Sequence, residues 1–113
     1  MSEERFTIRC VFDREFHFES YGVRIKIESD SQQLLDAAKE TVIAAFGERT
    51  EFIESKVCVA SHVFGVASDG VNYFLFKNGE QISYGKSDSL FFKFLNSSLR
   101  IVVAEHADSK VFL

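Results

Sequence analysis

The sequence predicts one α+β domain over residues 1–113, with a mostly antiparallel sheet and two helices in the order ββ-α-βββ-α-β. Three observations support this fold class. Several short segments alternate apolar and polar residues, as strands with one buried face do. Two longer segments repeat apolar residues at helical spacing. Asn78-Gly79 lies between two strand-like segments, and this pair is the strongest short-range signal of a hairpin.

The first two strands are predicted before residue 30. Apolar and polar residues alternate from Phe6 to Phe18, with a polar break at Asp13-Arg14. Tyr21-Gly22 then offers a bend, and the alternation resumes from Val23 to Ile27. We therefore expect strands that bury one face and expose the other, as in an antiparallel sheet.

The first helix is predicted from residue 31 to residue 46. Asp30 or Ser31 can cap its start, and Gly47 is suited to the left-handed conformation that often ends a helix. Residues with helical spacing form its apolar face: Leu34, Leu35, Ala38, Val42, Ala45 and Phe46. We expect this face to pack on the sheet, and residues 48–54 to form a charged, solvated connection.

Three strands are predicted after that connection. Residues 57–64 are apolar on both faces, which favours a central strand. Asp69-Gly70 predicts a turn before a dense apolar strand at 71–76. Residues 81–84 form the return strand of the Asn78-Gly79 hairpin.

The second helix is predicted to begin near Ser87 or Asp88 and to end near Glu105. Its apolar face comprises Leu90, Phe91, Phe94, Leu95, Ser98, Leu99, Val102 and Val103. Residues 107–109 predict a turn, and Val111-Phe112-Leu113 predicts an apolar terminal strand. Domains usually end in polar residues. We therefore expect an N-terminal accessory domain or a fragment of a longer protein.

Composition excludes several classes of function. The net charge is −4 and the 13 basic residues are scattered, which argues against nucleic-acid binding and against a polybasic membrane patch. No signal-peptide pattern and no apolar stretch of about 18 residues occurs. We expect a cytoplasmic protein in which Cys10 and Cys58 are reduced.

One segment is similar to a phosphate-binding loop but has the wrong spacing. Gly79 and the Gly85-Lys86-Ser87 triplet are separated by five residues, whereas such a loop needs four. Glu80 would also repel a phosphate at that place. We expect Gly85 to turn the chain and Ser87 to cap the second helix.

The remaining polar residues predict no catalytic, cofactor or metal site. His17, His62 and His106 lack metal-ligand spacing. Cys58 and His62 are four residues apart on one strand, about 13 Å, which is too far for a nucleophile and its base. Glu48, Glu51 and Glu54 are expected to form a solvated acidic loop.

The end of the chain resembles a known family. Residues 99–105 (Leu-Arg-Ile-Val-Val-Ala-Glu) and 110–113 (Lys-Val-Phe-Leu) are similar to the N-terminal region of HPr kinase/phosphorylase-related proteins. In that family an apolar helix leads to an apolar strand, then to a His-Ala-Gly-like segment and a P-loop. The resemblance covers residues 90–113 and implies that ATP binding and phosphotransfer belong to a region beyond this chain. No catalytic residue of the family maps onto it.

Two main hypotheses follow. In the first, the chain is a non-catalytic accessory, regulatory or oligomerisation domain of an HPr kinase-like protein. It would dock on the downstream domain or on another copy of the chain, as a homodimer, through Phe91, Phe94, Phe112 and Leu113. In the alternative, the chain is a free-standing small-ligand sensor or interaction module with an apolar pocket lined by Phe64, Tyr73, Phe74 and Phe76. A small enzyme is a third hypothesis, which a His–Glu or Cys–His contact would favour.

Overall fold

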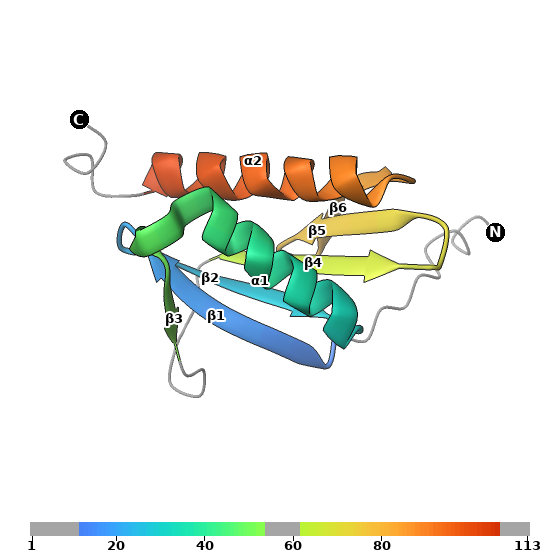
Figure 1. Ribbon diagram of the computed structural model, residues 1–113, viewed down its shortest axis with the longest axis horizontal. Coiled ribbons are helices and arrows are strands. Elements are labelled where there is room, and N and C mark those ends of the chain that lie inside the picture. Colours follow the sequence, from blue (N-terminus) through green and yellow to red (C-terminus); the bar gives the residue numbers. More distant parts are fainter. Residues whose placement is uncertain (1–11, 54–61, 107–113) are drawn as a thin grey trace.

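The computed structural model describes residues 12–53 and 62–106 of the chain. Over these residues it confirms the predicted α+β class and element order. A six-stranded mixed sheet has two helices on one face (Figure 1). The elements are β1 (Arg14–Ser20), β2 (Val23–Ser29), α1 (Gln32–Phe46), the 3-10 turn η2 (Gly47–Arg49), β3 (Glu51–Ile53), β4 (His62–Ser68), β5 (Tyr73–Lys77), β6 (Glu80–Gly85) and α2 (Asp88–His106).

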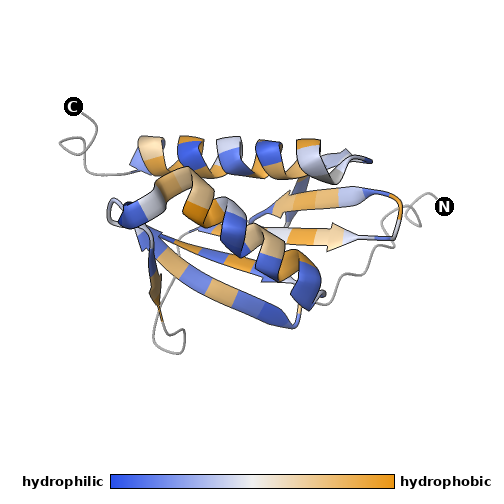
Figure 2. Cartoon of the chain, viewed as in Figure 1, coloured by the Kyte–Doolittle hydropathy of each residue, from blue (hydrophilic) through white to orange (hydrophobic). Residues whose placement is uncertain are grey.

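Strands β1 and β2 form the predicted antiparallel pair. Phe18 lies opposite Ile25, and the turn between the strands places Tyr21 at φ 53° and Gly22 at φ 80°. Hydrophobic and hydrophilic residues alternate along both strands (Figure 2). One face of the pair therefore packs on the helices, while the other carries charged side chains. The residues before Phe12, where the alternation begins, lie outside the described residues.

Helix α1 follows β2 and leads through η2 to β3, and β4 pairs in parallel with β2. Its cap is Ser31, whose Oγ accepts a hydrogen bond from the Leu34 amide at 3.3 Å. Gly47, at φ 55°, ends the helix and donates its amide to the Ile43 carbonyl. A helix that crosses a sheet returns the chain in the original direction, and β3, which is antiparallel to β1, accordingly runs in the same direction as β2.

The connection after α1 is more ordered than the sequence predicted. Residues 48–54 were expected to form a charged loop, and this was wrong for Glu51–Ile53, which form the edge strand β3 against β1. The Phe52 ring packs on Phe16 at 5.8 Å, and the Lys39 ammonium lies 5.0 Å from the Phe52 ring centroid. A strand of three residues is too short to show an alternating pattern, and so the sequence did not reveal it.

Strand β4 is central, as was predicted for the strand at 57–64, but it spans His62–Ser68 and overlaps the predicted strand only at residues 62–64, while residues 57–61 lie outside the described residues. It lies between β2 and β5 in the sheet order β3-β1-β2-β4-β5-β6. Phe64 and Val66 are buried under the helices, and Gly65 and Ala67 are buried on the opposite face. The Asn78-Gly79 hairpin then joins β5 to β6, with φ 51° and 88° at the two turn residues.

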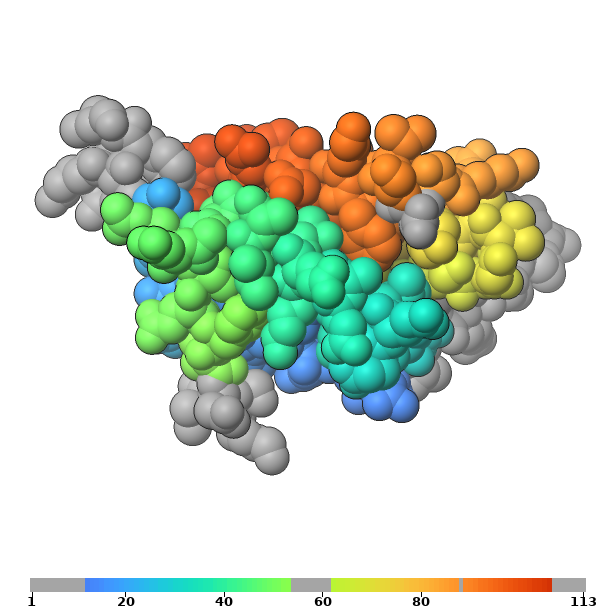
Figure 3. Space-filling view, in the orientation of Figure 1, coloured from blue at the N-terminus to red at the C-terminus, as the bar shows by residue number. Residues whose placement is uncertain are grey.

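The core lies between the sheet and the two helices. In the space-filling view, α1 and α2 lie side by side and cover this face of the strands (Figure 3). Phe91, Leu95, Leu99, Val102 and Val103 supply the α2 side of this core. Asn96-Ser97-Ser98 does not interrupt the helix, because burial of the residues on either side outweighs the weak propensity of these three.

Candidate functional site

The segment that resembles a phosphate-binding loop has the local structure expected from its spacing. Gly79 occupies the β5–β6 hairpin, and the Ser87 Oγ accepts a hydrogen bond from the Leu90 amide at 3.3 Å. Gly79 and Ser87 therefore belong to two separate structures, a hairpin and a helix cap. They do not form one loop around an anion.

A histidine–glutamate contact is present but is closed to substrate. His17 Nε2 lies 3.2 Å from Glu15 Oε2, and Lys26 lies 3.6 Å from the same carboxylate. His17 is only 6% exposed, and within the described residues neither of its ring nitrogens makes a hydrogen bond. A general base must reach a proton of its substrate. Because His17 is nearly buried, the contact does not present an exposed acid–base pair within the described residues.

A second histidine contact joins β4 to α2. The rings of His62, the first residue of β4, and His106, the last residue of α2, have centroids 4.4 Å apart. Burial lowers the pKa of His62, and the positive charges of His106 and Lys77 lower it further. These surroundings therefore favour the neutral form of His62. Cys10, Glu54 and Cys58 lie outside the described residues.

The four residues expected to line an apolar pocket lie on two faces of the sheet. Phe64 is fully buried under the helices, and Tyr73 stacks on Phe91 with ring centroids 5.4 Å apart. The register pairs Gly65 with Phe76 and Ala67 with Phe74, which places both of these phenylalanines on the opposite face. The four side chains do not converge on one cavity.

The residues expected at an interface are also separated. Phe91 is 4% exposed and belongs to the core, whereas Phe94 is 43% exposed. Phe112 and Leu113 lie outside the described residues. Of the four, only Phe94 is placed by the structure where a partner could reach it.

Phe94 belongs to a row along the outer surface of α2. The row follows a spacing of four and three residues, and every member is exposed: Leu90, Phe94, Ser97, Ile101 and Ala104. Leu90 and Ile101 are 65% and 56% exposed. Leu90 and Phe94 were predicted on the same apolar face as Phe91 and Leu95, and their exposure corrects that prediction. We call these five residues the outer row of α2.

The sequence already indicated this row, because the helix has more apolar residues than one buried face needs. Apolar residues occupy more than one third of the helix circumference, and a helix that buries one face needs only a stripe of about 100°. The helical spacing of four and three residues repeats on a second side. A second apolar side with this spacing is typical of a helix that packs against another helix.

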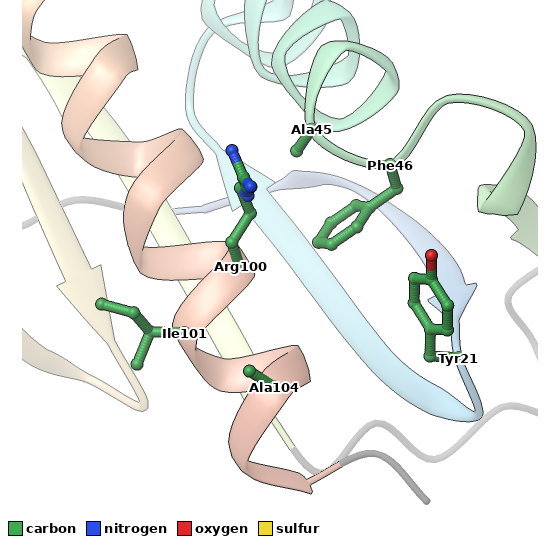
Figure 4. A pocket seen from close by; sticks show the side chains of 6 residues that line it. All are labelled: Tyr21, Ala45, Phe46, Arg100, Ile101 and Ala104. Carbon is green, nitrogen blue, oxygen red and sulfur yellow. The ribbon is translucent and has the colours of Figure 1, made fainter. Parts of the chain in front are cut away.

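A shallow cleft lies between the ends of α1 and α2 (Figure 4). It has a volume of about 330 Å³ and is lined by Tyr21, Ala45, Phe46, Arg100, Ile101 and Ala104. The guanidinium of Arg100 points toward α1 near Ala45, while the Ile101 side chain points away from the aromatic rings (Figure 4). Arg49 lies 5.5 Å from the Tyr21 ring centroid. The cleft thus combines apolar walls with positive charge.

No group of three metal-ligating side chains occurs in the described part of the chain. Neither helix in that part is long and apolar enough to cross a membrane. Searches of family models, of curated proteins and of solved structures found no match for this chain.

Proposed function

We propose that this chain is a non-catalytic accessory domain of an HPr kinase-like protein and that the outer row of α2 makes a protein–protein contact. The observation that carries the proposal is the exposure of Leu90, Phe94 and Ile101 along one side of a helix. The resemblance to the kinase family begins within this same helix. The described residues also bring together no open cluster of acid, base or nucleophile.

The outer row is suited to a protein partner because of its shape and chemistry. It extends from residue 90 to residue 104 along one exposed helix, and its members Ile101 and Ala104 also line the cleft between α1 and α2. A partner protein can cover such an extended row, whereas a small ligand would fill only the concave end. Covering a large apolar side chain contributes about 1.5–3 kcal/mol. Three such side chains on one helix therefore contribute favourably to a contact, and the cost of association is subtracted from that contribution.

The first test is the reading frame that follows the codon for Leu113. We expect it to encode a Gly-rich loop with Lys and Ser or Thr at the spacing of a true phosphate site. Such a loop would assign ATP binding and phosphoryl transfer to the downstream region. A stop codon at that point would exclude the kinase part of the proposal.

The second test compares one substitution in two contexts. In the natural full-length protein, Phe94→Glu should lower the unfolding free energy by about 2 kcal/mol or more, because it places a charge in a covered contact. In the dilute isolated chain, where Phe94 is partly exposed, the loss should be about 1 kcal/mol or less. Urea denaturation of both proteins measures the difference.

Ser89→Glu is the matched control. Ser89 is exposed on α2 and lies outside the outer row, so the added charge is the same and the position differs. Glu in the first turn of a helix is neutral or slightly stabilising. Equal losses for Phe94→Glu in both contexts would show that nothing covers the outer row, and this would remove the basis of the proposed contact.

A second candidate function rests on the cleft that Arg100 lines. Apolar walls beside two arginines fit a small ligand with an anionic head and an apolar body. Decanoate is a suitable probe, with binding measured by titration calorimetry. We expect Arg100→Gln to weaken binding about tenfold, the size of one charge-assisted hydrogen bond. Lys93→Gln on the same helix should leave binding unchanged, and equal effects of the two would exclude a ligand at this cleft.

A further inference from the structure

Four of the five residues of the outer row of α2 are arranged symmetrically along the helix. Its large members pair about a centre between Leu95 and Asn96, since Leu90 and Ile101 lie at equal distances from that point on opposite sides. Phe94 and Ser97 are likewise equidistant from it. An antiparallel copy of the same helix would therefore place Leu90 against Ile101 and the large Phe94 against the small Ser97.

We propose that the partner of the outer row is a second copy of this chain, with the two α2 helices packed antiparallel about a two-fold axis. This inference rests on the proposed function and names the partner at the same surface. Two-fold contacts are isologous, so a surface must be complementary to itself. The outer pair, Leu90 with Ile101, is apolar on both sides, and at the centre the large Phe94 faces the small Ser97, as a knob fits into a hole at a helix seam.

The charges at the two ends of the row support the same arrangement. Lys86 lies just before the helix and Glu105 lies near its end, and both are exposed. They are also equidistant from the centre of the row. In the antiparallel dimer, Lys86 of each copy therefore meets Glu105 of the other. A parallel dimer would instead bring like charges together at each end.

Two basic residues on the side of α2 that faces α1 make the dimer testable. Lys93 lines a cleft with Thr41 of α1, and Arg100 lines one with Ala45 of α1. A two-fold axis perpendicular to two antiparallel helices brings the same flank of each helix together. Lys93 of one copy then lies beside Arg100 of the other, because their positions along the helix axis differ by only two residues, or about 3 Å. These like charges oppose the dimer.

This geometry predicts opposite effects for the same new residue at adjacent positions. Lys93→Glu replaces a repulsion of Arg100 by an attraction, twice per dimer, and should lower the dimer dissociation constant about tenfold. Phe94→Glu places two carboxylates at the centre of the apolar seam and should raise it about a hundredfold or more. The measurement is sedimentation equilibrium of the chain over a range of concentrations, with wild type and both variants.

Lys93 is exposed, so Lys93→Glu does not threaten folding, and circular dichroism checks both variants. Tighter association for Lys93→Glu and weaker association for Phe94→Glu would support the antiparallel dimer. Monomers at every concentration for wild type and Lys93→Glu would overturn it, as would a Lys93→Glu dimer no tighter than wild type. If the chain is monomeric while Phe94→Glu still destabilises the full-length protein, the proposed function stands and the second copy is excluded as the partner.

Discussion

At the scale of single residues, Gly65 shows how a missing side chain shapes the sheet. A Cβ at position 65 would lie 2.9 Å from Cε2 and Cζ of Phe12, which is closer than non-bonded atoms approach a Cβ in folded proteins. The Phe12 ring also packs against Phe76, with centroids 5.7 Å apart. Gly65 therefore lets an aromatic ring lie directly on the backbone of the central strand.

Gly65→Ala should consequently lower the unfolding free energy by about 1–2 kcal/mol, because Phe12 must move from the strand. Gly85→Ala is the control, since a Cβ there meets nothing within 4 Å, and we expect a change below about 0.5 kcal/mol. Urea denaturation measures both. In a Phe12→Ala background the cost of Gly65→Ala should disappear, and a cost that persists would contradict the clash.

At the scale of elements, Asn78 does more than turn the β5–β6 hairpin. Its backbone N–H donates a hydrogen bond to the Val63 carbonyl at 2.7 Å, and its side-chain Oδ1 accepts one from the Val63 backbone N–H at 2.9 Å. Asn78 thus extends the pairing of β4 past the end of β5. The hairpin signal in the sequence predicted the turn, and the bond to β4 is a second reason for asparagine at this position.

Two substitutions separate these roles of Asn78. Asn78→Gly keeps access to φ 51° and loses only the side-chain acceptor, so we expect a loss of about 1 kcal/mol. Asn78→Ala loses the same acceptor and puts alanine, which tolerates the left-handed region less well than asparagine or glycine, at this φ, so it should cost about 2 kcal/mol. Thermal unfolding monitored by circular dichroism gives both values. Unchanged stability for Asn78→Gly would show that the bond to Val63 contributes nothing.

At the scale of the whole molecule, α2 is joined to the central strand at its last residue. His106 packs on His62 with ring centroids 4.4 Å apart, and burial together with His106 and Lys77 lowers the pKa of His62. Protonation of His62 is therefore easier in the unfolded chain than in the folded one. The contact links the attachment of the helix to pH.

The sign of this linkage follows from the direction of the shift. A histidine whose pKa falls on folding binds more protons in the unfolded state, so stability rises with pH toward the ordinary value of 6.5 and then levels off. We expect His62→Gln to remove this part of the pH dependence, and His106→Gln to reduce it. Thermal unfolding of wild type and of the two variants at several pH values below and above 6.5 measures this dependence. If stability changed with pH equally in wild type and His62→Gln, the pH dependence would not come from His62.

The fold was predictable because its signals are local. Alternation of apolar and polar residues predicted β1 and β2, a segment apolar on both faces predicted a central strand, and Asn78-Gly79 predicted the hairpin. The cap at Ser87 was predicted from residue type and position, and Ser31 was one of two candidates for the other cap, with Asp30. Strand β3 was missed because three residues are too few to carry a period, and its place beside β1 depends on a long-range pairing.

The candidate site was less predictable because exposure is a property of the assembled molecule. Phe91 and Phe94 are both aromatic and three residues apart, and the sequence treats them alike. Packing of α2 on the sheet buries Phe91 against Tyr73 and leaves Phe94 on the surface. In the same way, the pleat of β5 sends Tyr73 to the helices and Phe74 to the opposite face.

The sequence by itself determined the class of the fold, the order of its elements, the turns and the helix starts, because each depends on the conformational preferences of a few neighbouring residues. Only the tertiary structure decided the parallel pairing of β2 with β4, the cleft that Arg100 lines and the exposure of the outer row of α2. These features arise where elements distant in sequence meet, and the energy that selects among them comes from the burial of one shared core.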